Sequence, residues 1–199
     1  MNPGILLQIC CAPDASVAVE RLRDSHRVGL YFYNPNIQPE EEYQKREQEL
    51  HRLALLLGVQ VHSAPYDPEN WLMAVRGYEH EPEKGARCEI CFRMRLHVTA
   101  VAAKELCYDM FATVLTVSPH KDAALINRLG KEIEKETGIA YFESNFKKQD
   151  GFKRSLELSK QYNLYRQDYC GCVFSRRERM KIANRGNNER STVLRKITK

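Results

Sequence analysis

Six of the seven cysteines in this chain of 199 residues lie in three close pairs. The pairs are an adjacent pair, a C-x-x-C and a C-x-C: Cys10 with Cys11, Cys88 with Cys91, and Cys170 with Cys172. Thiolates at such spacings bind zinc or iron–sulfur clusters, and dithiols also exchange electrons. The three pairs therefore predict a metal-binding or redox centre. The seventh cysteine, Cys107, is expected to be a small core residue.

The C-x-x-C is expected to open a helix that runs to Leu106. Residues at i and i+3 share one face of a helix, so the thiols of Cys88 and Cys91 can reach one metal. A helix N-terminus also favours the thiolate, which is the form that ligates metals. A thioredoxin-like role is disfavoured because no strand directly precedes the pair. The structural alternative is two cysteines that are merely buried.

Together with the adjacent pair, the C-x-x-C supplies four thiols, the ligand set of an all-cysteine zinc site or a [4Fe–4S] cluster. Adjacent cysteines do not fit the usual C-x2-4-C turn, so both can contact one cluster only where the backbone bends, as Pro13 permits. Alternatively, one cysteine binds the cluster and the other bridges to a second site. Asp14 is then a candidate ligand of a second metal or a catalytic contact, and its structural alternative is the N-cap of the following helix.

The C-x-C has a different character from the other two pairs. A disulfide between Cys170 and Cys172 would close a small, strained ring and would be reduced easily. The pair therefore suits a redox-active dithiol better than a structural bridge, with metal ligation as the second interpretation. Four aromatic residues near it are candidates for stacking on a base, or alternatively for core packing: Tyr162, Tyr165, Tyr169 and Phe174.

Short apolar runs alternate with helical patterns along the chain. Strands are expected over residues 5–9, 28–33, 59–62, 110–116 and 139–142, and further helices over 39–57, 68–77, 122–137 and 152–161. This alternation predicts an α/β fold, with a mainly parallel five-stranded sheet and helices on both faces. Ligands of such sheets bind at the carboxyl ends of the strands, which is where the adjacent cysteines lie.

The net charge of +5 is spread unevenly. Residues 176–199 carry nine lysines and arginines against two glutamates, whereas the preceding residues are close to neutral. We therefore expect a catalytic metal-binding domain over 1–175 and a basic tail over 176–199. Such a tail suggests a polyanionic partner, most simply a nucleic acid, and the alternative is a solvated tail.

Other function classes are disfavoured by what the sequence lacks. No apolar stretch approaches the roughly 20 residues that span a bilayer, so no membrane association is expected. The first residues lack a basic segment followed by an apolar one, so we expect no secretory signal and a cytoplasmic location. The loop after the first strand lacks the Ser-Gly-Gly-x-Asp-Ser of ATP pyrophosphatases, and the chain has no Walker loop and no G-x-G-x-x-G, so neither ATP nor NAD chemistry is expected.

Four segments, in order, resemble the cobalamin-independent epoxyqueuosine reductases of the QueH type. They are Cys10-Cys11-Ala12-Pro13, Tyr33-Asn34-Pro35-Asn36-Ile37, Arg87-Cys88-x-x-Cys91-Phe92-x-x-Arg95-Leu96 and Asp168-Tyr169-Cys170-Gly171-Cys172-x-Phe174-Ser175. The resemblance extends from about Ile5 to Ser175. It implies a HUP-like three-layer sandwich, similar to tRNA-thiolating enzymes but without their ATP loop.

The resemblance also implies the reduction of epoxyqueuosine to queuosine at the wobble position of tRNA. It implies iron–sulfur ligation by Cys10, Cys11, Cys88 and Cys91, and a redox-active role for Cys170 and Cys172. The implied cofactor is a [4Fe–4S] cluster, with an additional mononuclear iron as an open alternative. The implied partners are a tRNA that carries epoxyqueuosine in its anticodon loop and an electron donor that the sequence does not identify. Two competing hypotheses are a zinc-stabilised RNA-binding module without catalysis and a thiol oxidoreductase acting on proteins, which the basic tail disfavours.

Overall fold

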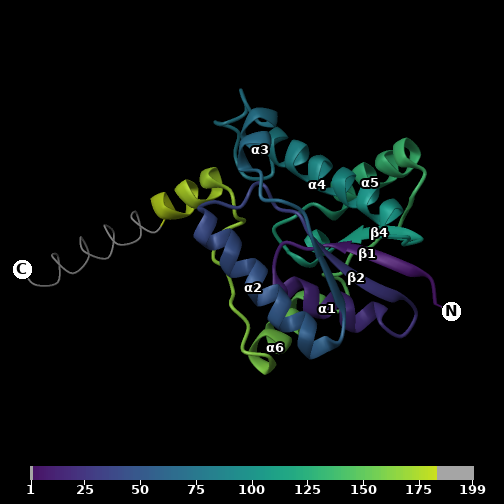
Figure 1. Cartoon of the computed structure of the whole chain (residues 1–199). Coiled ribbons are helices and arrows are strands. Elements are labelled where there is room, and N and C mark those ends of the chain that lie inside the picture. The colour runs from purple at the N-terminus through teal and green to yellow at the C-terminus, as the bar shows by residue number, and fades with distance from the viewer. Residues whose placement is uncertain (1, 183–199) are drawn as a thin grey trace, which may run out of the picture.

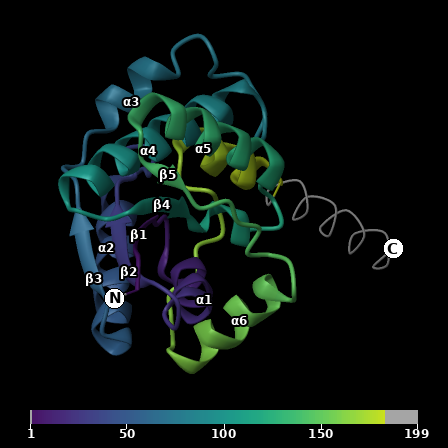
Figure 2. The ribbon, with the colours of Figure 1, turned by 90° about the vertical axis from the view of Figure 1, so that its right-hand side faces the viewer.

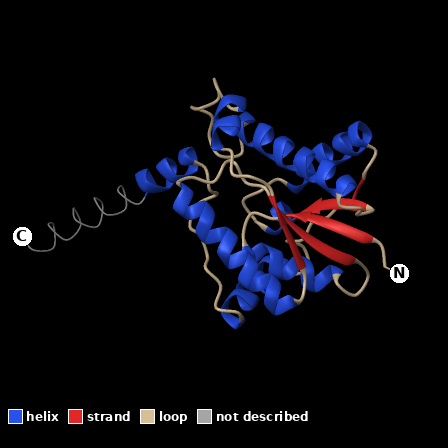
Figure 3. Ribbon diagram, viewed as in Figure 1, coloured by secondary structure: helices blue, strands red, loops and turns tan. Residues whose placement is uncertain are grey.

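The central strand of the protein is β1, whose five residues are all buried. The computed structural model describes residues 2–182 of the chain. The strands form one sheet (Figure 3). It has five parallel strands in the order β3-β2-β1-β4-β5. Their bounds are β1 Gly4–Gln8, β2 Arg27–Phe32, β3 Gln60–Ser63, β4 Met110–Thr113 and β5 Ala140–Tyr141. The predicted five-stranded parallel sheet is confirmed.

Helices cover both faces of the sheet and make three layers (Figures 1 and 2). One face is covered by α1 (Ala12–Leu22), α2 (Glu40–Leu57) and α6 (Gly151–Gln161), and the other by α4 (Ala86–Glu105) and α5 (Ala123–Thr137). The short α3 (Pro68–Ala74) packs on the first part of α4. Side chains of β1 alternate between the two cores, because Ile5 and Leu7 pack with α1 and α2 whereas Leu6 packs with α4 and α5.

The order of the strands reverses between β1 and β4, which makes this point the topological switch of the sheet. The chain runs outward from β1 through β2 to β3, and then crosses over the sheet to β4 on the other side of β1. The loops that leave these two central strands therefore diverge, and the crevice between them is the usual ligand site of open α/β sheets. Cys10 and Cys11 follow β1 directly.

Two expected elements differ from the structure. The strand expected over 110–116 ends at Thr113, and a 3-10 helix, η1 (Val114–Val117), follows. The Thr113 side chain accepts a hydrogen bond from the Leu115 N–H at 3.1 Å, which turns the chain away from the sheet. The helix expected over 68–77 ends at Ala74.

Residues 173–182 are helical, so the described part of the expected basic tail continues a helix that begins before residue 176. The expected division into 1–175 and 176–199 stays a prediction, and residues 183–199 lie outside the described residues. Within residues 2–182, no helix combines the length and the apolar character that crossing a bilayer requires.

Candidate functional site

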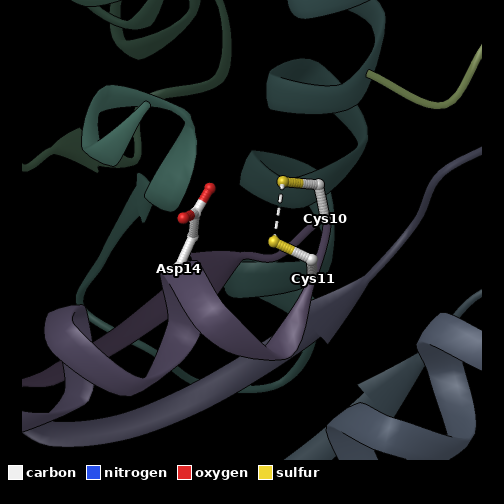
Figure 4. Close-up of side chains that lie close together, drawn as sticks. All are labelled: Cys10, Cys11 and Asp14. Carbon is white, nitrogen blue, oxygen red and sulfur yellow. Dashed lines mark hydrogen bonds between the residues drawn. The ribbon is translucent and has the colours of Figure 1, made fainter. Parts of the chain in front are cut away.

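Cys10 and Cys11 lie in the turn that joins β1 to α1, and Asp14 lies in the first turn of that helix. The two sulfurs are 4.0 Å apart, and both sulfurs and the Asp14 carboxylate lie within 4.8 Å of one another (Figure 4). Within residues 2–182, this is the one group of three histidine, cysteine or acidic side chains close enough to hold a single metal ion. The alternative of Asp14 as the N-cap is wrong, because Cys11 holds that position in an extended conformation.

The three groups of this cluster differ in their affinity for protons. The hydrogen bond between the two sulfurs lowers the pKa of Cys10, with help from the positive charge of Arg95 and Arg46. The same bond, together with burial, raises the pKa of Cys11. Burial also raises the pKa of Asp14 to about 7, and the charge of Cys10 adds to this effect. Nearby arginines therefore favour negative charge on Cys10, whereas burial opposes negative charge on Cys11 and Asp14.

The C-x-x-C lies in the first turns of α4, as predicted. Cys88 accepts a hydrogen bond from the Lys84 N–H at 3.3 Å, and Cys91 packs with Trp71 and Cys172. Burial raises the pKa of Cys88, and it raises that of Cys91 to about 11. The helix N-terminus was expected to favour the thiolate form of these two cysteines. In the free thiols, burial outweighs this effect. Cys88 and Cys91 do not join the group of atoms within 4.8 Å that the other cysteine pair forms with the carboxylate.

Arg95 lies within electrostatic range of both cysteine pairs, a role that the sequence reasoning did not assign. It lies one turn after Cys91 on α4 and is 1% exposed. Although burial opposes the charge, negative charge on Cys91 and Cys10 raises the pKa of Arg95. Its Nη2 donates to Gln8 Oε1 at 3.3 Å, and its Nε has no hydrogen-bond partner among residues 2–182.

A buried amide network fixes the strand ends beneath these thiols. Gln8 is the last residue of β1, and its Oε1 accepts hydrogen bonds from Arg95 and from Thr113 of β4. Its Nε2 donates to Asn34 Oδ1 at 3.3 Å, and Asn34 Nδ2 donates to the Ile9 carbonyl at 2.8 Å. The carboxyl ends of β1, β2 and β4 are thus tied to α4, so the site has a rigid base.

The two cysteines of the C-x-C face different surroundings. Cys170 lines a cavity of about 480 Å³, and Cys10 and Asp14 line the same cavity. The Cys170 sulfur accepts a hydrogen bond from Lys121 Nζ at 2.8 Å. Cys172 is buried, and its sulfur accepts a hydrogen bond from the Ser175 N–H at 3.3 Å. All seven cysteines are free thiols in the structure, so the oxidised form of this pair stays a prediction.

The loop that carries the C-x-C is held from α2. Arg46 donates from Nη1 to the Cys170 carbonyl at 3.1 Å and from Nη2 to the Tyr169 carbonyl at 3.3 Å. Gly171, between the two cysteines, has a φ of 137°, which disfavours any side chain. A Cβ at this position would also lie 2.9 Å from Ile37 Cγ1. Glycine is therefore required for this loop to approach the body of the protein.

The four aromatic residues near the C-x-C divide between packing and the cavity wall. Tyr162 packs against the core and Phe174 packs against Trp71, with 6.0 Å between the latter two ring centroids. The Tyr165 hydroxyl donates to the Glu42 carboxylate. Tyr169 lines the cavity and is the best placed of the four for stacking. The expectation that Cys107 is a core residue is wrong, because it lies exposed in the turn after α4.

Four buried cations near the cysteines were given no role by the sequence reasoning: Arg46, Arg87, Arg95 and Lys121. The sequence did hold a signal for Arg95, because this residue falls within one of the four recognised segments and follows Cys91 by one helical turn. The sequence holds no such signal for Arg46 or Lys121. Each of them reaches the site from a segment that is distant in sequence from the cysteine that it contacts.

Comparison with known proteins adds independent information. A solved structure of the predicted subunit of a tRNA methyltransferase from Methanocaldococcus jannaschii is similar, with a TM-score of 0.53, 16% identity and coverage of 79% of this chain and 74% of that chain. The U34-tRNA thiolase NcsA from Methanococcus maripaludis, solved with its [4Fe–4S] cluster, has a TM-score of 0.52 and 14% identity, covering 94% of this chain and 66% of that one. At these identities the likeness concerns the fold alone, and it confirms the predicted HUP-like sandwich.

Comparison of sequences finds relatives whose identity to this chain is much higher than that of the two solved structures. Residues 5–178 match the family described as epoxyqueuosine reductase QueH. The epoxyqueuosine reductase QueH of Streptococcus pyogenes is 41% identical over 181 residues, which cover 88% of this chain and 71% of that protein. The QueH proteins of Staphylococcus aureus and Thermotoga maritima are 42% and 38% identical, over 88% of this chain and over 76% and 91% of their own lengths. The match spans nearly the whole described structure, including all three cysteine pairs, so the chain belongs to the QueH family of epoxyqueuosine reductases and is an oxidoreductase of queuosine biosynthesis.

Proposed function

We propose that this chain reduces epoxyqueuosine to queuosine at the wobble position of tRNA, with a [4Fe–4S] cluster held by the first four cysteines and electrons held by Cys170 and Cys172. The observation that carries the proposal is the shared cavity at the topological switch point. Cys10 of the proposed cluster site and Cys170 of the proposed redox pair both line it. A substrate in this cavity would therefore meet both centres.

The donor set and its surroundings fit an iron–sulfur cluster. Four thiolates around a cluster leave a net negative charge, and buried Arg46, Arg95 and Lys121 supply positive charge close to it. The unpaired Nε of Arg95 leaves a donor for a sulfur acceptor. The four cysteines of a cluster also lie farther apart than the ligands of one ion. Cys88 and Cys91 therefore do not need to fall within 4.8 Å of the other pair.

Cys10, Cys11 and Asp14 also suit one additional iron next to the cluster, because two sulfurs and one carboxylate converge there (Figure 4). When bound, the cluster supplies one-electron transfer and an adjacent iron supplies a Lewis acid. The raised pKa of Asp14 lets this carboxyl hold a proton near neutral pH when no metal occupies the position.

The dithiol supplies the electrons in pairs. Oxidising Cys170 and Cys172 to a disulfide releases two electrons and two protons. Reducing the epoxide to an alkene consumes two electrons and two protons, and the epoxide oxygen leaves as water. One turnover therefore balances within the protein, and an electron donor that the sequence does not identify must reduce the disulfide before the next one.

The proposed substrate enters as a base turned out of its stack. The anticodon loop is single-stranded, so the cost of unstacking a base there is small. Phe152 and Tyr169 line the cavity and offer surfaces for stacking. Arg179 lines the same cavity, and Arg176 and Arg179 line a neighbouring hollow that also includes Tyr169. These arginines suit contacts with phosphates on either side of the base.

A single-turnover experiment tests the proposal. The protein is reconstituted anaerobically with iron and sulfide, reduced, freed of reductant and mixed with tRNA that carries epoxyqueuosine. We expect at most one queuosine per protein, measured by mass spectrometry of the nucleosides, with an equal amount of disulfide between Cys170 and Cys172. Cys170→Ser and Cys172→Ser should keep the iron and sulfide of the parent and form no queuosine, whereas Cys107→Ser should behave as the parent.

Other outcomes of this experiment would redirect the assignment. Full activity in either serine variant would remove the pair from the mechanism. Loss of about one iron without loss of sulfide would make the pair metal ligands instead. A colourless protein that binds zinc, binds tRNA and forms no queuosine would favour the zinc-stabilised RNA-binding module.

A further inference from the structure

Lys121 is an unusual residue of this site because its ammonium is buried beside a thiol. It lies in the loop between η1 and α5, on the β4 side of the switch point, and its side chain is 8% exposed. Its Nζ lies 2.8 Å from Cys170 Sγ and 3.2 Å from Glu83 Oε1. A buried ammonium is costly unless negative groups surround it. Glu83 is one such group, and the Cys170 sulfur is in position to be the second.

The two sulfurs of the C-x-C differ in their hydrogen-bond donors. Cys170 accepts from a full positive charge and faces the cavity. Cys172 accepts from a neutral N–H of Ser175, lies 3.5 Å from the Ser175 hydroxyl, and packs among Trp71 and Val75. Charge-assisted hydrogen bonds stabilise an anion more strongly than neutral ones do. The surroundings of the two sulfurs therefore differ, because a cation faces Cys170 at the cavity whereas Cys172 lies among apolar side chains.

Other charged groups around Cys170 do not replace Lys121. Arg95 is a second cation within electrostatic range of Cys170, but Lys121 is the hydrogen-bond donor to this sulfur within residues 2–182. Cys88 and Cys91 are acidic groups within range on the other side. Burial opposes the charge of Lys121, yet Cys170 and Glu83 raise its pKa, so the side chain stays an ammonium.

We propose that Lys121 is a positioning residue that stabilises negative charge on the Cys170 sulfur and so makes Cys170, rather than Cys172, the reactive thiol of the pair. The proposal rests on the redox role proposed above for these two cysteines. Lys121 therefore acts through Cys170, and Glu83 is the second negative partner that shares the ammonium with it.

The test is the rate at which neutral iodoacetamide alkylates Cys170 in the reduced holoprotein, followed by peptide mass spectrometry at one pH. The thiolate is the form that reacts, so the rate reports negative charge on this sulfur. We expect Lys121→Met to slow alkylation about tenfold and Lys121→Arg, which keeps a cation, to stay within about threefold of the parent. Lys131→Met removes a lysine that pairs with Glu134 on the surface of α5, and it should leave the rate unchanged.

Iron and sulfide contents measured in the same samples identify any variant that has lost its fold. An unchanged alkylation rate in Lys121→Met with parental metal content would overturn the proposal, and so would a rate in Lys121→Arg as low as in Lys121→Met. If Lys121→Met loses its metal, Glu83→Gln replaces it in the comparison. In Glu83→Gln, Cys170 is the one remaining partner of the Lys121 ammonium that can carry negative charge. Slower alkylation of Cys170 in that variant would therefore contradict the proposal. Alkylation does not depend on turnover, so a failure of the proposed redox role would show in queuosine formation and leave this result intact.

Discussion

Arg46 in α2 donates a hydrogen bond to the main-chain carbonyl of Cys170, 124 residues later in the chain, at an N–O distance of 3.1 Å. The same guanidinium donates to the Tyr169 carbonyl and pairs with Glu42 at 2.7 Å, and it is 1% exposed. One side chain thus holds the backbone of the C-x-C loop against the body of the protein. The position of the proposed redox pair therefore depends on α2.

Arg46→Lys should weaken both the fold and the activity. An ammonium cannot reproduce the planar fork that reaches two carbonyls and a carboxylate, so buried acceptors lose their donors. We expect the free energy of unfolding, measured with urea under anaerobic conditions, to fall by about 1–3 kcal/mol. Queuosine formation should fall as well. The matched control is Arg52→Lys, because the half-exposed Arg52 on the same helix also donates to two backbone carbonyls. Equal activity in the two variants would contradict the role of Arg46.

Cys88→Ala and Cys91→Ala should each lose the cluster. Four thiols are the full ligand set in the proposed site, so a missing thiolate leaves one corner of the cluster without a protein ligand. Iron and sulfide should both fall well below the parental contents, and stability should decrease because metal binding contributes to folding. Cys107→Ala removes the exposed cysteine and should keep full contents. Parental iron and sulfide in either of the first two variants would refute the four-cysteine assignment.

Gly171→Ala should displace the C-x-C loop. The new Cβ would combine an unfavourable φ of 137° with a contact of 2.9 Å to Ile37, which should cost about 1–3 kcal/mol of unfolding free energy and most of the activity. Gly138→Ala is the comparison, because Gly138 also has a positive φ and ends α5, yet a Cβ added there would have no atom within 4 Å. That variant should lose about 1 kcal/mol and keep its activity. Unaltered turnover in Gly171→Ala would show that the loop tolerates displacement.

Arg176→Gln and Arg179→Gln should weaken tRNA binding and flatten its dependence on salt. Each arginine that neutralises a phosphate releases counterions, so its loss should reduce the slope of log affinity against log salt by about 1. Binding is measured by filter retention or fluorescence at several salt concentrations. Arg154→Gln, which removes an exposed arginine paired with Glu20, is the control and should leave the slope unchanged. Parental slopes in both test variants would indicate a solvated basic segment without phosphate contacts.

The sequence by itself determined the elements of this fold and the position of its chemistry along the chain. Apolar runs placed β1 and β2 within one residue of their observed bounds, and Gly138 marked the end of α5, where it adopts the left-handed conformation. These features are local, because strand and helix periodicities and C-caps depend on residues a few positions apart. The cysteine pairs were visible for the same reason.

Tertiary structure alone decided which charges meet these cysteines. Lys121 reaches Cys170 across 49 residues and Arg46 reaches its carbonyl across 124, and both are charged residues of types that usually face solvent. Whether such a residue is buried depends on a partner that the fold brings to it, so no local pattern announces it. The same reason explains Cys107, which a local pattern placed in the core although the turn after α4 leaves it exposed. Burial of charge is a property of contacts between distant segments, and only the folded chain specifies those contacts.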